Sequence, residues 1–381
     1  MAKQNSNKAL IVFLIALFYY VLVFHNNLGA ITITSIFCLL VLLSSVRSAF
    51  NKNTMLLLAY GVSFAMIMFL KGGFDISSVA DTILPPFCFY LFGRIVVDYY
   101  YPKQEKMYLF LLLTAFFFGS YFYYWTLYDM ILTGNIVSPQ RFLTIQDASI
   151  GATLVGTNVS LGFVGISVFS ILKDAKLRFG FLVVWILSIL ATVHMLNRSG
   201  IIITFICLTI VLLVYFKNTK HFSRMIFVVS FLVIVVVILE AIPSLQDVFV
   251  AYSEREVAGD DSALLSGGGR TSRWIYALEQ IPSNPFGWES YGWVHNMWLD
   301  VAKQAGWIPF IFIVAITIKC INSARRIVRS RKDAFSCTIL GLNLCMFLAA
   351  MVEPVMGGAF FGCYCMLWGF QERYCSLIIR Q

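Results

Sequence analysis

The sequence predicts an all-α polytopic membrane protein, and three observations lead to this fold class. Of its 381 residues, 60% are hydrophobic and 12% are charged, and the mean hydropathy is +0.82. The charged share of soluble domains is about 25%. The apolar residues also gather in about twelve runs of the length that a helix needs to cross a ~30 Å hydrocarbon core. The third observation is that lysine and arginine are concentrated in alternate connecting segments, as the retention of positive charge in the cytoplasm predicts.

The expected spans follow the apolar runs in order, and polar residues, glycine or proline separate each run from the next. They cover residues 9–25, 30–46, 54–70, 78–97, 107–127, 149–172, 179–196, 199–216, 225–242, 306–322, 335–352 and 355–371. This divides the chain into nine spans in residues 1–242, a polar loop in residues 243–305, and three spans with a cytoplasmic tail in residues 306–381.

The basic residues predict which side of the membrane each loop faces. With the N-terminus inside and twelve spans, 21 of the 28 basic residues lie on the cytoplasmic side. The outward segments hold the other seven: Lys71, Arg141, Arg198, Arg255, Arg270, Arg273 and Lys303. Both termini are then cytoplasmic, and the loop at 243–305 faces outward. The basic run 325–332 then lies in a short cytoplasmic loop, where positive charge is expected. We therefore interpret it as a sign of membrane orientation rather than of nucleic-acid binding.

The placement of the cysteines and the lack of nucleotide-binding motifs exclude two classes of protein, namely disulfide-stabilised domains and nucleotide-dependent enzymes. All nine cysteines fall in expected spans or on the cytoplasmic side, so no disulfide framework is predicted. The chain has no Walker sequence and no dinucleotide fingerprint, and its cytoplasmic loops are too short to hold a domain. We therefore expect the chemistry to take place within the membrane or at its outer surface, without a nucleotide cofactor.

The polar loop at 243–305 carries the residues best suited to chemistry. Apolar residues at helical spacing over 271–281 predict a short amphipathic helix on the membrane surface, with Arg270 and Arg273 near its start. A helix dipole disfavours cations at this end, which indicates that an anion compensates them. Arginines three residues apart on one helical face are suited to binding phosphate oxygens.

Three further residues are candidates because of their position. His295 follows in the same loop, where a neutral imidazole can take a proton from a sugar hydroxyl or orient it. Arg198 lies in the short link 194–200 between two expected spans, and an arginine at this depth usually faces a cavity or an anion. Arg141, in the outward segment 128–148, is a weaker candidate.

A metal mechanism is not predicted, because acidic residues are sparse on the outward side. The first outward segment, 25–29, contains no carboxylate pair. Asp260 and Asp261 are adjacent in a glycine-containing stretch and are expected to be solvated. Asp300 stands alone, five residues after His295.

At these residues the chain resembles the superfamily of bacterial O-antigen polymerases and O-antigen ligases. The resemblance rests on Gly269-Arg270 before a tryptophan-bearing helix, the turn 284–288 (Asn-Pro-Phe-Gly-Trp), and His295-Asn296 followed by Gly306. Asn197-Arg198-Ser199-Gly200 is similar to the family's arginine between two spans. Together these segments cover about 110 residues, and the remaining spans agree only in hydropathy and number.

The resemblance implies a GT-C-like enzyme of the bacterial inner membrane, with its site on the periplasmic face. It would transfer a glycan from undecaprenyl pyrophosphate to an acceptor hydroxyl without a metal or another cofactor. His295 would be the base or the acceptor-orienting group, and the pyrophosphate would be bound by Arg198, Arg270 and Arg273. Asn296, Asp300 and Arg141 would support or orient the substrates. A flippase and a chain-length regulator of the same pathway would be its partners.

Polymerase and ligase share this core, and both remain open at this point. The ligase pattern continues Gly-x-x-Gly, whereas here Gly306-Trp307-Ile308 is followed by Pro309, which favours a polymerase of repeat units. A transporter or flippase is the alternative from another class. It would show related halves and charges spread over many spans, whereas here the polar groups gather in one loop.

Overall fold

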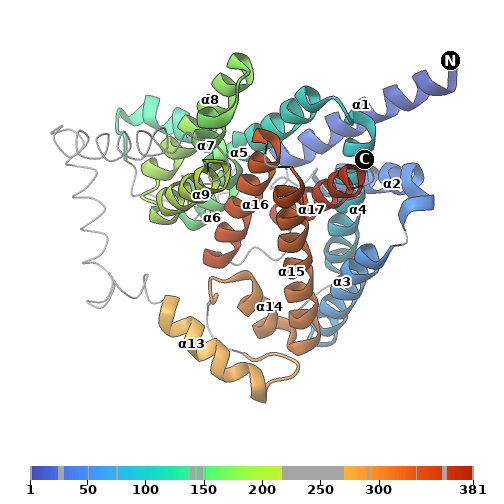
Figure 1. Cartoon of the computed structure of the whole chain (residues 1–381). Coiled ribbons are helices and arrows are strands. Elements are labelled where there is room, and N and C mark those ends of the chain that lie inside the picture. Colours follow the sequence, from blue (N-terminus) through green and yellow to red (C-terminus); the bar gives the residue numbers. More distant parts are fainter. Residues whose placement is uncertain are drawn as a thin grey trace. The chain divides into compact units, whose positions relative to one another are not determined.

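The computed structural model (Figure 1) describes residues 2–24, 30–49, 51–73, 76–137, 142–143, 149–150, 152–216, 270–289, 292–331, 333–353 and 358–379. These residues are helical apart from turns, short links and one pair of two-residue strands. The strands β1 (Phe142–Leu143) and β2 (Ser149–Ile150) pair antiparallel, with Phe142 opposite Ile150. The helical membrane character predicted from composition agrees with this architecture.

Six helices are long and apolar enough to cross a membrane, judged among the described residues. They are α3 (Lys52–Leu70), α5 (Gln104–Thr133), α8 (Ala175–His194), α9 (Arg198–Phe216), α15 (Trp307–Ser330) and α16 (Ala334–Val352). Helices α1 (Ala2–Phe24), α2 (Ala30–Ala49), α4 (Ile76–Tyr100) and α17 (Gly358–Ile378) also follow expected spans. The expected span at 225–242 lies outside the described residues, so the number twelve stays a prediction.

The segment expected as a span over 149–172 is not one continuous helix. It consists of strand β2, helix α6 (Ala152–Asn158), the 3-10 helix η1 (Ser160–Val164) and helix α7 (Gly165–Ile171). Glycines let this segment approach its neighbours closely. A Cβ at Gly162 would lie 1.9 Å from Ser188 Oγ, and one at Gly165 would lie 2.2 Å from the Phe181 carbonyl oxygen. Hydropathy alone predicts a helix here, because the interrupting residues are small rather than charged.

The chain divides into two compact units, each built from segments far apart in sequence. The first unit comprises Met1–Phe118, Tyr276–Ser330 and Pro354–Gln381, and the second comprises Gly119–Ile275 and Arg331–Glu353. Helix α13 (Arg270–Gln280) contributes residues 270–275 to the second unit and residues 276–280 to the first. The division of the chain by membrane side, with a loop at 243–305, concerns topology and stays a prediction.

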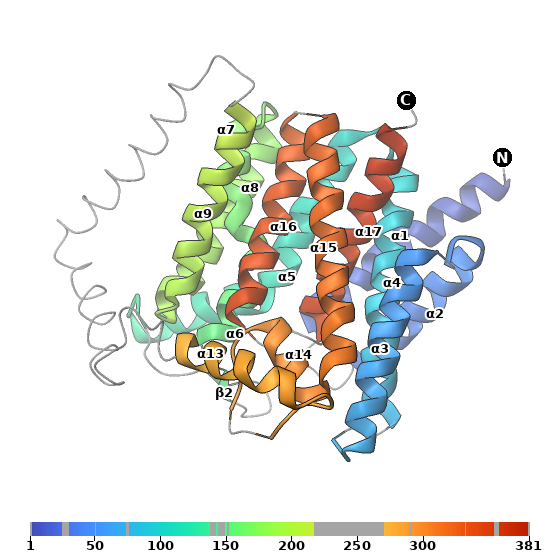
Figure 2. The same cartoon turned by 60° about the horizontal axis from the view of Figure 1, so that its bottom comes forward.

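In the first unit, α3, α4, α15 and α17 lie side by side (Figure 2). The backbones of α4 and α17 touch at two glycines. A Cβ at Gly93 would lie 2.1 Å from the Met366 carbonyl oxygen, and one at Gly369 would lie 1.9 Å from the Tyr90 carbonyl oxygen. Small residues at a helix interface permit this close approach, which is a common way to pack helices in lipid.

The first unit also has an aromatic core that joins α1, α2, α4 and α5. Five buried rings lie with their centroids 4.9 to 6.2 Å apart in contacting pairs. These rings belong to Phe18, Phe37, Phe89, Phe92 and Phe110. Aromatic pairs at such distances contribute about 0.5 to 1.5 kcal/mol beyond the area they bury.

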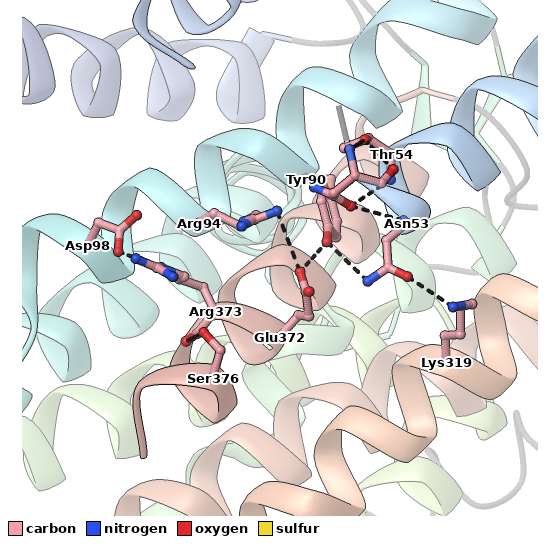
Figure 3. Close-up of polar contacts among 10 residues, drawn as sticks. Asn53, Thr54, Tyr90, Arg94, Asp98, Lys319, Glu372, Arg373 and Ser376 are labelled. Carbon is pink, nitrogen blue, oxygen red and sulfur yellow. Dashed lines mark hydrogen bonds and ion pairs between the residues drawn. The ribbon is translucent and has the colours of Figure 1, made fainter. Parts of the chain in front are cut away.

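A polar network joins four helices of the first unit (Figure 3). The Tyr90 hydroxyl donates to the Glu372 carboxylate, and it accepts from the Asn53 side-chain amide at 3.3 Å. Lys319 donates to Asn53 Oδ1 at 3.1 Å, and Arg94 Nη1 lies 3.8 Å from Glu372. The network thus connects α3, α4, α15 and α17 at one level.

Helix α3 contacts this network at its first turn and contacts the helix that follows His295 at its other end. Asn53 lies at the start of α3, and Lys71 follows its last residue. Lys71 Nζ donates to the carbonyl oxygen of Gln304 at 3.0 Å. With a rise of 1.5 Å per residue, the 19 residues of α3 place the two levels roughly 28 Å apart. The sequence predicts the cytoplasmic side for Lys319 and the outward side for Lys71, which is the same order as these two levels.

In the second unit, α7, α8, α9 and α16 pack around η1. Helices α8 and α9 lie side by side (Figure 2). Buried polar side chains are satisfied locally here: the Tyr123 hydroxyl and Ser188 Oγ are 2.7 Å apart, and Ser188 also donates to the Val184 carbonyl oxygen at 2.9 Å. A Cβ at Gly341 would lie 2.5 Å from Val164 Cγ2, so α16 lies directly against η1. The short link 195–197 then positions Arg198 at the start of α9.

Candidate functional site

In the first unit, the turn 284–288 is hydrogen-bonded to the helices that follow His295. The turn is bound to the C-terminal end of α14 (Met297–Ala305), because the Trp288 amide donates to the Lys303 carbonyl oxygen at 2.9 Å. The Trp307 amide donates to the Pro285 carbonyl oxygen at 3.0 Å. The turn therefore stays against the junction of α14 and α15.

Two glycines make this backbone contact possible. Gly287 and Gly306 have φ of 84° and 74°, in the left-handed region that glycine adopts without strain. A Cβ at Gly306 would lie 1.9 Å from the Pro285 carbonyl oxygen, and one at Gly287 would lie 2.3 Å from the Lys303 carbonyl oxygen. The turn 284–288 and Gly306, which the sequence pattern brought together only by spacing, are in direct contact in the fold.

His295 itself has φ of 61°, an uncommon conformation for a residue other than glycine. Asp300 holds it there. The Asp300 carboxylate accepts from the amide of Val294 through Oδ1 at 2.8 Å and from the amide of Asn296 through Oδ2 at 3.0 Å. The side chain of Asp300 is fully buried, whereas His295 is half-buried. Asp300 therefore positions the histidine through its backbone.

Burial raises the pKa of the Asp300 carboxyl above its ordinary value. Loss of solvent is the largest cause, and it outweighs the two backbone hydrogen bonds and the nearby His295 and Lys303, all of which lower the pKa. Lys303 also belongs to this support, since its ammonium group donates to the Gly292 carbonyl oxygen.

Asn296, which was predicted to orient substrate, is the N-cap of α14. Its side-chain oxygen accepts from the Leu299 amide at 3.2 Å, and the residue is 7% exposed. An asparagine at this position stabilises the first turn of the helix. The predicted part in substrate binding is not tested by this contact and stays a prediction.

Sequence reasoning used Lys71 only to assign membrane sides, yet the fold brings it to this segment. Besides its bond to Gln304, Lys71 lies near Glu289. Partial desolvation lowers the pKa of Lys71, and the charge of Glu289 raises it by a smaller amount. The only signal in the sequence was that Lys71 is one of the few basic residues expected on the outward side.

In the second unit, Arg198 is the first residue of α9 and is half-buried. Asn197 shapes this helix start: its Oδ1 accepts from Ser199 Oγ at 2.6 Å and from the Gly200 amide at 3.2 Å. Leu196, with φ of 52°, makes the sharp reversal before it. The arginine predicted from its place between two spans is thus held at a fixed helix N-terminus.

Arg270 is the first residue of α13, the amphipathic helix that the sequence predicts. Its Nη2 lies 3.1 Å from Glu353 Oε1, and the side chains of Arg270 and Glu353 are 22% and 4% exposed. The anion that compensates this arginine in the structure is thus an internal carboxylate. Arg273 lies one turn further along α13 and is exposed. Glu353 was missed, because it is 83 residues from its partner and no local pattern marks it.

A second missed contact joins α5 and α8. His194 is fully buried, its Nδ1 is 2.8 Å from the Ile136 carbonyl oxygen, and its Nε2 is 2.8 Å from Asp129 Oδ2. Each ring nitrogen thus has an oxygen within hydrogen-bond distance. The sequence offered His194 and Asp129 only as separate residues near span ends.

Several predicted features lie outside the described residues, namely Arg141, the glycine run 267–269 and the acidic pair at 260–261. Within the described parts of the chain, no three His, Cys, Asp or Glu side chains are grouped so that they could hold a metal ion. All nine cysteines are buried and have free thiols.

The described part of the chain is therefore helical, with six helices long and apolar enough to cross a membrane, and its predicted site residues lie in both compact units. His295, Asn296 and Asp300 belong to the first unit, and Arg198, Arg270 and Glu353 belong to the second. Models of known protein families do not match the chain, and a search of curated proteins finds no significant match. The function must therefore be argued from these residues.

Proposed function

We propose that this chain is a membrane glycosyltransferase that polymerises a surface polysaccharide such as O-antigen. It transfers the growing glycan from undecaprenyl pyrophosphate to a hydroxyl of a lipid-linked repeat unit. The observation that carries the proposal is that Arg198 and Arg270 are each the first residue of a helix. Helix N-termini favour anions through their dipole and free amides, and guanidinium groups bind phosphate oxygens with two parallel hydrogen bonds.

His295 supplies the second half of this chemistry. In the proposed reaction its imidazole takes the proton of the acceptor hydroxyl while the hydroxyl oxygen bonds to the anomeric carbon of the donor. The bond between that carbon and the pyrophosphate oxygen breaks, and the pyrophosphate leaves with the electron pair. Arg198 and Arg270 neutralise the charge that develops on the leaving group, with Arg273 as support. The proton later leaves His295 to solvent or to the released pyrophosphate.

The support of His295 agrees with this role. Asp300 holds the backbone on both sides of the histidine, so the imidazole is presented without a large loss of entropy during reaction. The segments concerned are expected on the periplasmic face of the inner membrane. There the enzyme would meet repeat units delivered by a flippase and act with a chain-length regulator.

The experiment that tests the proposal is a lipopolysaccharide gel of cells that lack this chain, complemented by the intact chain. Loss of a polymerase leaves lipid A–core capped by a single repeat. Uncapped core, with long polymer retained on the polyprenyl carrier, identifies an O-antigen ligase that transfers the glycan to lipid A–core. An unchanged ladder contradicts both assignments.

A transporter remains the second candidate, and the interrupted segment α6–η1–α7 is the observation that favours it. Broken helices within membrane proteins often form substrate sites. This one places buried Thr157, Asn158 and Ser160 beside its break. Purified protein in liposomes separates the two functions. A transporter moves labelled lipid-linked sugar between leaflets without lengthening it, whereas a polymerase lengthens it.

A further inference from the structure

The contact between Arg270 and Glu353 joins two residues at helix ends that disfavour their charges. Arg270 begins α13, where the helix dipole is positive, and Glu353 is the C-cap of α16, where the dipole is negative. Each charge is stabilised by the other across 3.1 Å rather than by its own helix. A stronger counter-ion for either residue can therefore break this ion pair.

Glu353 and Arg270 differ in how deeply they are buried. Glu353 is 3% exposed, and a buried carboxylate is costly unless a cation or hydrogen-bond donors compensate it. Arg270 keeps 22% of its side chain exposed, and its contact with Glu353 uses one nitrogen of a group with five N–H donors. The arginine is thus accessible to a second anion, whereas the carboxylate is enclosed.

We propose that Glu353 is an internal counter-ion that competes with lipid-linked pyrophosphate for Arg270 and promotes release of the polyprenyl pyrophosphate product. This inference rests on the proposed function, since it takes Arg270 as a pyrophosphate ligand. A pyrophosphate carries more negative charge than one carboxylate and accepts two parallel hydrogen bonds from a guanidinium group, so it displaces Glu353 on binding. When the glycan has been transferred, return of Glu353 to Arg270 weakens the hold on the product.

The competition has a quantitative consequence. A ligand whose binding-competent state is only partly populated binds more weakly by that fraction, and closure of Arg270 on Glu353 lowers this population. Removing the charge of Glu353 should therefore strengthen pyrophosphate binding. A purely structural carboxylate that only orients Arg270 predicts the opposite sign.

Helix α16 offers a matched control at its other end. Asp333 is its N-cap and lies 3.0 Å from Arg331 Nε, so it is also a carboxylate paired with an arginine. Asn is an equally good N-cap, so Asp333→Asn removes one charge and keeps the cap. The 19 residues of α16 separate the two acids by roughly 28 Å.

The experiment measures binding of farnesyl pyrophosphate to the full-length protein in detergent by calorimetry, with inorganic pyrophosphate as a second probe. We expect Glu353→Gln to bind farnesyl pyrophosphate on the order of tenfold more tightly than the wild type. Arg270→Gln should bind it more weakly, and Asp333→Asn should be unchanged. A gain with both probes identifies the pyrophosphate group as the ligand, and a gain with farnesyl pyrophosphate alone shows that the prenyl chain is also required. In turnover, Glu353→Gln should be more strongly inhibited by added polyprenyl pyrophosphate.

Unchanged or weaker binding by Glu353→Gln, with weaker binding by Arg270→Gln, overturns the counter-ion and leaves the proposed function standing. Unchanged binding by Arg270→Gln removes Arg270 from the proposed site, and both ideas fail there. If Glu353→Gln does not fold, Glu353→Asp takes its place. Its shorter side chain keeps the charge but loosens the contact, so an intermediate gain supports the competition and a loss contradicts it.

Discussion

The carboxylate of Asp300 holds the backbone on both sides of His295, through the amides of Val294 and Asn296 at 2.8 and 3.0 Å. The histidine between them has φ of 61° and a half-buried side chain. An isolated loop histidine would sample many conformations, whereas this one is held from a fully buried residue on α14. Such support of a reactive group by a second residue is what catalysis by positioning requires.

Replacement of His295 tests its chemical role. Asparagine tolerates the left-handed conformation, so His295→Asn removes the base with little backbone strain. We expect transfer to fall roughly 10²- to 10⁴-fold, the usual contribution of general acid–base catalysis, while thermal unfolding changes little. The measurement is elongation of lipid-linked repeat units by purified protein. Activity within a few-fold of the wild type would remove His295 from the mechanism.

Asp300→Asn tests whether the hydrogen bonds from Asp300 to the backbone around His295 are needed for stability and activity. The new amide presents N–H groups to one of the two backbone amides, which costs about 1 to 3 kcal/mol of stability. We expect transfer to fall with it, because the His295 backbone is released. Chemical denaturation and the elongation assay measure the two effects on the same sample.

The raised pKa of Asp300 also predicts a pH dependence of stability. The folded state binds the proton more tightly than the unfolded state, whose carboxyl titrates near its ordinary value of 3.8. Stability from this group is therefore highest below that value and falls as the pH rises toward the raised pKa. Relative to Asp300→Asn, the wild type should lose unfolding free energy over this interval. A constant difference between the two proteins across that interval would contradict the prediction.

Gly306→Ala should destabilise the first unit through two separate effects. Gly306 has φ of 74° and ψ of −156°, a conformation that costs about 1 to 3 kcal/mol for a residue other than glycine, and the new Cβ would overlap the Pro285 carbonyl oxygen. Gly292→Ala is the matched control, because its φ of 73° is nearly the same and a Cβ there meets nothing within 4 Å. Thermal unfolding should show a clearly larger loss for Gly306→Ala. Equal losses would mean that the turn can move away.

The contact between His194 and Asp129 should contribute more than an exposed ion pair. Asp129→Ala removes the carboxylate bound by a fully buried ring, and we expect a cost of about 1 to 3 kcal/mol. Asp98→Ala breaks the contact with Arg373 at the surface, where the expected cost is about 0 to 1 kcal/mol. Denaturant titrations of both variants decide the order, and the reverse order would show that His194 finds another partner.

Arg198 should be needed both for its charge and for its shape. Arg198→Gln is expected to lower transfer roughly 10²-fold, as loss of a transition-state donor does. Arg198→Lys should recover part of this, because lysine keeps the charge but cannot form two parallel bonds. Arg178→Gln serves as the control and should leave transfer unchanged. Arg178 lies near the start of α8, over the Phe169 ring at 5.2 Å, whereas the link to Arg198 follows the end of that helix. Full activity of Arg198→Lys would show that the two parallel bonds are not needed, and equal activities of the two Arg198 variants would show that charge alone contributes nothing.

The sequence by itself determined the helical membrane character and most helix positions. Apolar runs predict helices because each residue contributes to hydropathy independently of distant neighbours. The start of α15 at Trp307 and the short helix α13 agree with their patterns within one residue. Span 149–172 was the exception, since contacts of Gly162 and Gly165 with α8, invisible to hydropathy, accompany its break into α6, η1 and α7.

The tertiary structure alone decided which charges meet. Glu353 and Arg270 are 83 residues apart, His194 and Asp129 are 65 apart, and Tyr90 and Glu372 are 282 apart. Spacing identified His295, Asp300 and Gly306 as neighbours along the chain, but only the folded backbone showed that Asp300 binds the amides around His295. Ion pairs and backbone contacts act over a few ångströms between segments that helix packing brings together, so a local pattern cannot specify them.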